Sequence, residues 1–148
     1  MGRVSTYLNF MGNTEEAFNF YRGVFGTEFH EGTMRMGDMP SDPNMPALSD
    51  AEKKMIMHIE LPILAGHVIM ATDMIESMGH ILTVGNNTTI NLEPDSREET
   101  DRLYNALSEG GAEGSGMIDM FWGAYWGSCL DQFGVRWMFN YAEANATL

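Results

Sequence analysis

The chain has 148 residues, of which 44% are hydrophobic and 20% are charged, so it can form one folded domain with a substantial apolar core. Its 21 acidic and 8 basic side chains give a formal net charge of −13, which disfavours nucleic acids and anionic membrane surfaces as partners. The single cysteine excludes an internal disulfide, and no run approaches the ~20 apolar residues of a membrane span, so we expect a cytoplasmic protein.

The first half of the chain has the pattern of a strand, a helix and three strands. A β-rich run at 4–10 predicts a strand, and apolar residues then recur at helical spacing between Asn13 and Gly26. Asn13 and Glu16 are spaced as a capping box. The segment 37–54 contains three prolines, which predicts an irregular loop able to cover a binding site. Further strands are predicted at 27–36, 55–63 and 67–73.

The second half has the same order of predicted elements. A strand at 88–92 precedes a helix at 97–109, for which Ser96 and Glu99 form a predicted capping box. Three more strands are predicted through Tyr141. The chain is therefore expected to be a single domain, 1–148, built from one duplicated module. Module one is expected at about 4–73 and module two at about 83–141.

Two alignments support the duplication. Sliding the first module by 82 positions places Thr6 on Thr88 and keeps the strand core and the helix face in phase. At the ends of the modules the offset is 68, which places Met70 on Met138. The smaller offset reflects the long loop of the first half.

The strand predicted at 55–63 has two different faces. One face is apolar and consists of Met57, Ile59, Leu61 and Ile63. Because side chains alternate along a strand, we expect this face to pack under a helix and His58 and Glu60 to lie on the concave side. At the offset of 68, His58 aligns with Trp126. The second module would then have an indole where the first has an imidazole.

Three segments resemble one protein superfamily. FYRGVFG at 20–26 resembles the FYxxxLG helix end of the vicinal-oxygen-chelate superfamily, which includes glyoxalases, bleomycin resistance proteins and dioxygenases. FWGAYWG and DQFGVRWM, within 121–140, resemble its PhnB-like branch, and GHVIMATD at 66–73 is similar to a hairpin of that branch. The resemblance spans about residues 4–141. It implies an α+β fold in which two βαβββ modules form curved mixed sheets around a cavity, usually in a homodimer.

The resemblance also allows a metal site to be tested. Metal-using members place His, Gln or Glu at equivalent inward positions of the two modules. Alignment of the motifs puts these positions at Thr6, Met70, Thr88 and Met138. Threonine and methionine do not hold a divalent metal by themselves, so we expect no metal and no other cofactor. His58 and Glu60 could be substitute ligands, but two ligands do not make a site.

Other reactive residue types have ordinary structural interpretations. Cys129 has no neighbouring group that would activate it, so we expect a small buried side chain. Asp73 and Asp131 lie at strand ends, where we expect them to accept hydrogen bonds in turns. Some relatives carry names from ubiquinone-biosynthesis methyltransferases. That reaction is not expected, because no glycine-rich turn joins a strand to a helix.

The leading hypothesis is a metal-free homodimer that binds a small, partly apolar or aromatic molecule in its cavity. The 14 methionines could form a deformable binding wall, or simply a methionine-rich core. The expected cavity residues are His58, Glu60, Trp122, Trp126, Met138, Thr6, Thr88 and Met70. Two alternatives remain open: a metal-dependent lyase, isomerase or dioxygenase of the glyoxalase type, and a dimerisation domain whose cavity is filled by its own side chains.

Overall fold

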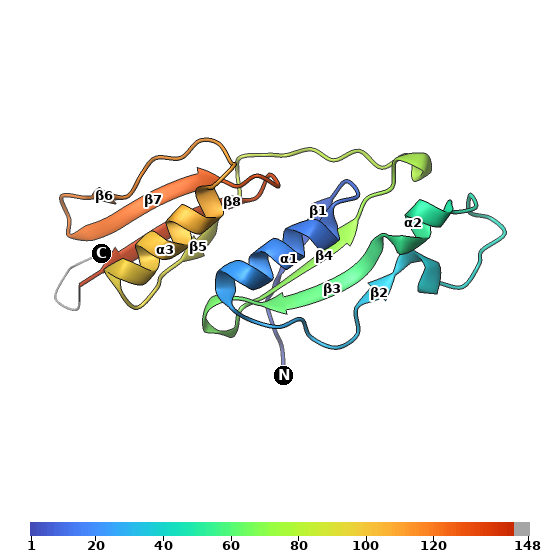
Figure 1. Cartoon of the computed structure of the whole chain (residues 1–148), viewed down its shortest axis with the longest axis horizontal. Helices are drawn as coiled ribbons and strands as arrows, with labels where there is room; N and C mark the ends of the chain where they lie inside the picture. Colours follow the sequence, from blue (N-terminus) through green and yellow to red (C-terminus); the bar gives the residue numbers. More distant parts are fainter. Residues whose placement is uncertain (144–148) are drawn as a thin grey trace. The chain divides into compact units, whose positions relative to one another are not determined.

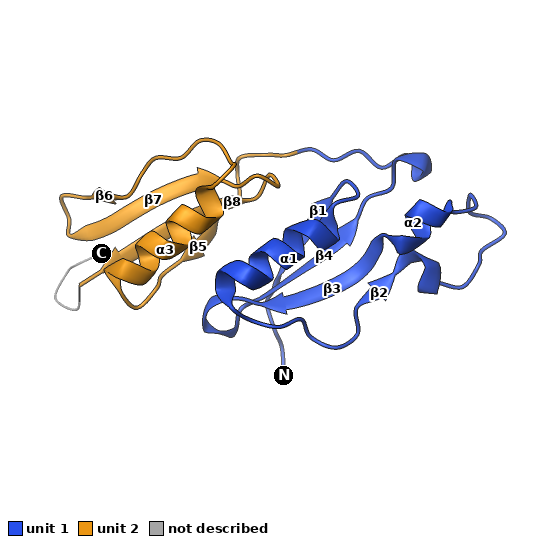
Figure 2. Cartoon of the chain, viewed as in Figure 1, with its two compact units in different colours: residues 1–83 blue, residues 84–148 orange. Residues whose placement is uncertain are grey.

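The computed structural model divides the chain into two compact units, 1–83 and 84–148, which Figure 2 shows in different colours. The structure describes residues 1–143. Each unit is built around its own four-stranded mixed sheet. The predicted α+β fold with two such sheets is therefore confirmed.

Unit 1 contains a sheet in the order β1-β4-β3-β2 with a helix packed on it (Figure 1). Its helices and strands are β1 (Thr6–Phe10), α1 (Thr14–Phe25), β2 (Met34–Arg35), α2 (Asp50–Lys54), β3 (Ile56–Pro62) and β4 (Val68–Asp73). β1 is parallel to β4, whereas β3 is antiparallel to both β4 and β2. α1 packs against β3 and β4. Phe10, Phe18 and Tyr21 are buried there and make edge-to-face ring contacts.

Unit 2 repeats this arrangement with the order β5-β8-β7-β6. Its helix and strands are β5 (Ile90–Leu92), α3 (Arg97–Ser108), β6 (Ile118–Asp119), β7 (Ala124–Leu130) and β8 (Arg136–Ala142). β5 is parallel to β8, and α3 packs against β7 and β8. Trp137 and Phe139 are buried, and Tyr104 of α3 contacts the Phe139 ring edge-to-face. The two units thus share one topology, as the sequence repeat predicts.

The strand pairing corrects the offset of the first strand. Leu8 lies opposite Ala71, and Leu92 lies opposite Phe139. Phe139 corresponds to Ala71 at the offset of 68, so Leu92 corresponds to Leu8 and the offset is 84 (92 − 8) instead of 82. A shift of two residues keeps every side chain on the same face of the sheet, which is why the apolar pattern alone did not reveal it.

A buried carboxylate of β4 fixes the start of α1. Asp73 accepts hydrogen bonds from the backbone N–H of Thr14 at 3.0 Å and of Ile56 at 2.8 Å. Asn13 makes no capping hydrogen bond through its side chain, so the capping box predicted for Asn13 and Glu16 is wrong. Asp73 links helix to sheet, where a local turn had been expected.

The N-cap at Ser96 and the turn role of Asp131 are confirmed, whereas the capping box predicted for Ser96 and Glu99 is only half formed, because the Glu99 carboxylate accepts from Arg102 instead. Ser96 caps α3 by accepting from the backbone N–H of Glu99 at 3.0 Å. Asp131 holds the β7–β8 turn together and also fixes the core indole. Its donors are the backbone N–H groups of Phe133 and Val135 and the Trp137 Nε1–H.

The segment between α1 and β3 differs most from expectation. The strand predicted at 27–36 is reduced to β2, and Gly32 just before it has a φ of 100°, a conformation that interrupts a strand. The loop predicted at 37–54 ends in the short helix α2, which Ser49 and Glu52 cap reciprocally. No helix within residues 1–143 is long and apolar enough to cross a membrane.

Candidate functional site

The pairing register separates the two faces of the unit 1 sheet. Ile59 and Leu61 are fully or almost fully buried on the side of α1. Met57 is only half-buried and Ile56 is buried in its place, because the pairing with β2 shifts at that end of β3. We call the opposite side the open face of unit 1. It carries Tyr7, His58, Glu60 and Met70, of which Tyr7, Met70 and Glu60 lie in one rung across β1, β4 and β3.

Polar groups on this face form a connected network. The Tyr7 hydroxyl lies 3.3 Å from His58 Nδ1, and their ring centroids are 5.9 Å apart. The other imidazole nitrogen, His58 Nε2, lies 3.8 Å from Glu60 Oε1. Glu60 also pairs with Arg3 at 3.2 Å and with His30 at 3.6 Å. His58 and Glu60 are thus brought together as predicted, whereas Tyr7, Arg3 and His30 are additions from the structure.

Two pKa values in the network depart from their ordinary ranges. Burial raises the pKa of Tyr7, and a hydrogen bond with Thr72 offsets only part of this effect. Burial raises the pKa of Glu60. The hydrogen bond and positive charge of Arg3, together with His58 and His30, lower it by more than burial raises it, so the net pKa of Glu60 is below its ordinary value. At neutral pH the face therefore presents a neutral phenol beside an ionised carboxylate.

Thr6 lies on the other side of the sheet, which corrects the expectation that it lines the cavity. It pairs with Ile69, which is fully buried, and its hydroxyl lies 2.9 Å from His67 Nε2. Tyr7 takes the inward position instead. The turn between β1 and α1 differs in length from the turn that the aligned motif implies. A shift of one residue along β1 places a side chain on the opposite face of the sheet.

The open face of unit 2 is defined in the same way, as the side of its sheet away from α3. Met138 pairs with Ser128 of β7 and with Asn91 of β5, and these three form the rung equivalent to that of Met70. Trp126 and Asn140 form the next rung. Thr88 lies before β5 and is exposed, so Asn91 takes the inward position assigned to it.

The two predicted tryptophans have different surroundings. Trp126 is half-buried on the open face, beside Asn140, whose Oδ1 atom is buried without a hydrogen-bond partner in the described part of the chain. Trp122 lies outside the strand pairing, in the turn between β6 and β7. It is 42% exposed and contacts Phe121 edge-to-face. Trp126 therefore belongs to the open face and Trp122 does not.

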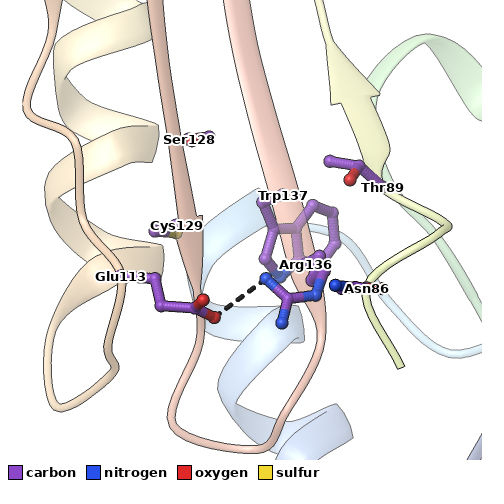
Figure 3. A pocket seen from close by; sticks show the side chains of 7 residues that line it. All are labelled: Asn86, Thr89, Glu113, Ser128, Cys129, Arg136 and Trp137. Atoms are coloured by element: carbon purple, nitrogen blue, oxygen red, sulfur yellow. Dashed lines mark ion pairs between the residues drawn. The ribbon is translucent and has the colours of Figure 1, made fainter. Parts of the chain in front are cut away.

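A hollow of about 260 Å³ lies in unit 2 beside β7 and the start of β8 (Figure 3). It is lined by Asn86, Thr89, Glu113, Ser128, Cys129, Arg136 and Trp137. Arg136 donates from Nε to the Gly85 carbonyl at 2.8 Å and forms an ion pair with Glu113, also at 2.8 Å. We call this site the Arg136 hollow.

The sequence alone does not reveal the hollow. Strand alternation could have placed Arg136 opposite the buried Trp137, but no sequence signal pairs it with Glu113. That pair depends on the backbone of Glu113, which has a φ of 54° although it is not glycine.

The donor set of the corrected inward positions does not fit a divalent metal ion. These positions hold Tyr7, Met70, Asn91 and Met138, which are a neutral phenol, two thioethers and an amide. Zn²⁺ requires thiolate, imidazole or carboxylate ligands, and Mg²⁺ requires charged or strongly polar oxygens. Among residues 1–143, no three His, Cys, Asp or Glu side chains are grouped as metal ligands. The inward positions are therefore better suited to contact with an organic ligand than to metal binding.

Comparison with known proteins gives matches along nearly the whole chain. A family model described as 3-demethylubiquinone-9 3-methyltransferase matches residues 2–139. Protein YjdN of Escherichia coli (strain K12) is 30% identical over 97% of this chain and 98% of its own. The crystal structure of protein PA1353 from Pseudomonas aeruginosa has a TM-score of 0.79 and 33% identity, covering 96% of this chain and 98% of the other.

More distant structures share the fold. A putative 3-demethylubiquinone-9 3-methyltransferase, the PhnB protein of Bacillus cereus, has a TM-score of 0.73 and 24% identity, with 95% and 100% of the two chains covered. A glyoxylase/bleomycin resistance protein/dioxygenase domain from Frankia sp. EAN1pec has a TM-score of 0.64 and 11% identity, with 97% and 98% covered.

Proposed function

Because the chain belongs to the PhnB-like branch of the vicinal-oxygen-chelate superfamily, we propose that it is a metal-free protein that binds a small, partly apolar or aromatic molecule. The model of this family is described as 3-demethylubiquinone-9 3-methyltransferase. The main binding surface is the open face of unit 2, and the open face of unit 1 is a second surface with hydrogen-bonding groups. The observation that carries the proposal is the hollow lined by Ser128, which pairs with Met138 across β7 and β8 and lies two residues from Trp126 along β7.

The residues of this face suit a flat ligand with one hydrogen-bond donor. Trp126 and Met138 are both half-buried and offer an aromatic ring and a polarisable thioether. Asn140, in the same rung as Trp126, has a buried carbonyl oxygen without a partner in the described residues. A buried acceptor of this kind costs about 1–3 kcal/mol, and a ligand N–H or O–H group would recover this energy once the Asn140 side chain turns its oxygen toward the open face.

Methyl transfer, which the family description names, has no support in the local structure. A nucleotide-type cofactor is commonly held by a glycine-rich turn between a strand and a helix. Here the β1–α1 turn at 11–13 contains only Gly12, and the β5–α3 turn at 93–96 contains no glycine. Neither turn therefore has the glycine-rich sequence that would favour a methyl-donor cofactor of this type.

Calorimetric titration with 3-phenylpropanamide tests the proposal. This probe has a flat ring and an amide that donates hydrogen bonds. The parent protein should bind it, and Trp126→Ala should weaken binding about tenfold or more, since stacked aromatic anchors contribute most of the energy of such sites. Trp122→Ala is the matched control and should bind as the parent does. Equal binding by the parent and Trp126→Ala, or selective loss in Trp122→Ala, would place the site elsewhere.

A further inference from the structure

We infer that Arg136 binds the carboxylate of the ligand and that Glu113 occupies this position in the free protein. The inference rests on the proposed function, because the apolar body of the same ligand would lie on Met138 and Trp126. The preferred ligand is therefore an aryl or alkyl carboxylate rather than a neutral aromatic compound.

Arg136 is held in place independently of Glu113. Its Nε–H donates to the Gly85 carbonyl at 2.8 Å, and its side chain is only 22% exposed. The Nη1 edge faces Glu113 at 2.8 Å. A guanidinium has five N–H donors in one plane, so one edge can stay on the backbone while the other exchanges its carboxylate.

Glu113 is a weakly held partner. Its carboxylate is 56% exposed, and exposed ion pairs contribute little because water and salt screen them. Its φ of 54° is a left-handed conformation, which is unfavourable for a residue with a Cβ. Backbone hydrogen bonds of Ala112 with Leu130 and of Ser115 with Ser128 hold this segment independently of the ion pair, so the exposed Glu113 carboxylate can leave Arg136 without disturbing the backbone.

The rest of the hollow offers neutral hydrogen-bonding groups. Asn86, Thr89 and Ser128 line it together with Arg136, and Figure 3 shows Glu113 and Asn86 on opposite sides of the guanidinium in that view. A carboxylate has two oxygens, and these amide and hydroxyl groups can accommodate the one that Arg136 does not bind.

The strand pairing limits the length of the ligand. Arg136 pairs with Leu130, and the next rung along the open face contains Ser128 and Met138. Adjacent rungs on one face are roughly 7 Å apart, since a strand rises about 3.4 Å per residue. A carboxylate on Arg136 would therefore place a ring two or three carbon atoms away over Met138. The net charge of −13 does not prevent binding of an anionic ligand. Salt screens charges farther away than roughly 8 Å, so the nearby Arg136 guanidinium dominates the local potential.

Titration of 3-phenylpropanoate and 3-phenylpropanamide, at physiological ionic strength, tests the inference. The parent should bind the carboxylate about tenfold more tightly than the amide. Arg136→Gln should abolish this preference, whereas Arg102→Gln should keep it, because Arg102 pairs with Glu99 on α3 outside the hollow. Glu113→Gln should tighten carboxylate binding at least threefold and leave amide binding unchanged. This last variant decides the matter if Arg136→Gln does not fold.

The outcomes separate the two proposals. Equal binding of both probes by the parent and by Glu113→Gln overturns the inference and leaves the proposed function standing. A carboxylate preference that depends on Arg136 but is insensitive to Trp126→Ala supports carboxylate binding at Arg136 and contradicts the proposed function, which places the apolar body of the ligand on Trp126. Failure of both probes to bind either the parent or Glu113→Gln overturns both.

Discussion

Met70 and Met138 occupy equivalent positions in the two units, each in the middle of a three-strand rung on the open face. Met70 pairs with Tyr7, and Met138 pairs with Asn91. A thioether at both positions favours contact with an apolar ligand over metal chemistry.

The first prediction concerns metal content. Tag-free protein should contain well under one equivalent of Zn, Fe, Mn, Ni or Co per chain, measured by elemental analysis, because the inward positions provide no suitable donor set. The substitute ligands His58 and Glu60 are the internal control. About one metal per chain that disappears in His58→Ala would contradict the prediction.

The second prediction concerns the buried carboxylate of β4. Asp73→Ala should lower the free energy of unfolding by about 2–4 kcal/mol, since it leaves two buried backbone donors without an acceptor. Urea unfolding monitored by circular dichroism measures this loss. Asp42→Ala is the matched control, because Asp42 is exposed and serves only a local turn. Equal stability of the two variants would argue against the anchoring role of Asp73.

The third prediction concerns the Cys129 thiol. Burial, and to a smaller extent the charge of Asp131, raises the pKa of Cys129 from its ordinary value of 9.0 to about 11. The native protein should therefore react very slowly with a disulfide reagent at pH 8, and reaction should become fast in denaturant. Rapid native reaction would contradict the burial of this side chain.

The same pKa shift has a consequence for stability. The unfolded chain loses the Cys129 proton near pH 9.0 and the folded chain near pH 11, so the unfolded state binds fewer protons between these values. The contribution of this thiol to stability is thus complete below pH 9.0 and is lost as the pH rises to about 11. Cys129→Ala should remove that part of the pH dependence.

The fourth prediction is a homodimer. The sheets have edge strands β1 and β2 in unit 1 and β5 and β6 in unit 2, and a symmetric partner can pair with such edges and cover the adjoining apolar surface. Light scattering at micromolar concentration should give twice the chain mass of 16.5 kDa. A value at the chain mass itself would contradict the prediction.

Sequence patterns were sufficient where a property depends on local spacing. Apolar residues at helical intervals predicted α1 and α3 within a residue or two, and alternation along β3 separated His58 and Glu60 from the buried Ile59. These periodicities follow directly from helix and strand geometry.

Properties that depend on turns and distant contacts could not be predicted in this way. Thr6 was assigned the place of Tyr7 because one residue more or less in a turn reverses the face of a strand. Asp73 replaced Asn13 as the partner of the α1 N-terminus, a contact that only the tertiary structure creates. The pairing of Arg136 with Glu113 likewise requires a left-handed backbone that no sequence pattern indicates.

The indole N–H signals of the three tryptophans provide the most direct test of ligand binding on the open face of unit 2. Trp126 lies on that face, Trp122 in the exposed turn, and Trp137 in the core bound to Asp131. In ¹⁵N-labelled protein, with signals assigned from Trp→Phe variants, titration with 3-phenylpropanamide should shift the Trp126 signal most. The Trp122 signal should change little. A saturable shift of Trp122 with an unmoved Trp126 signal would contradict binding at this face.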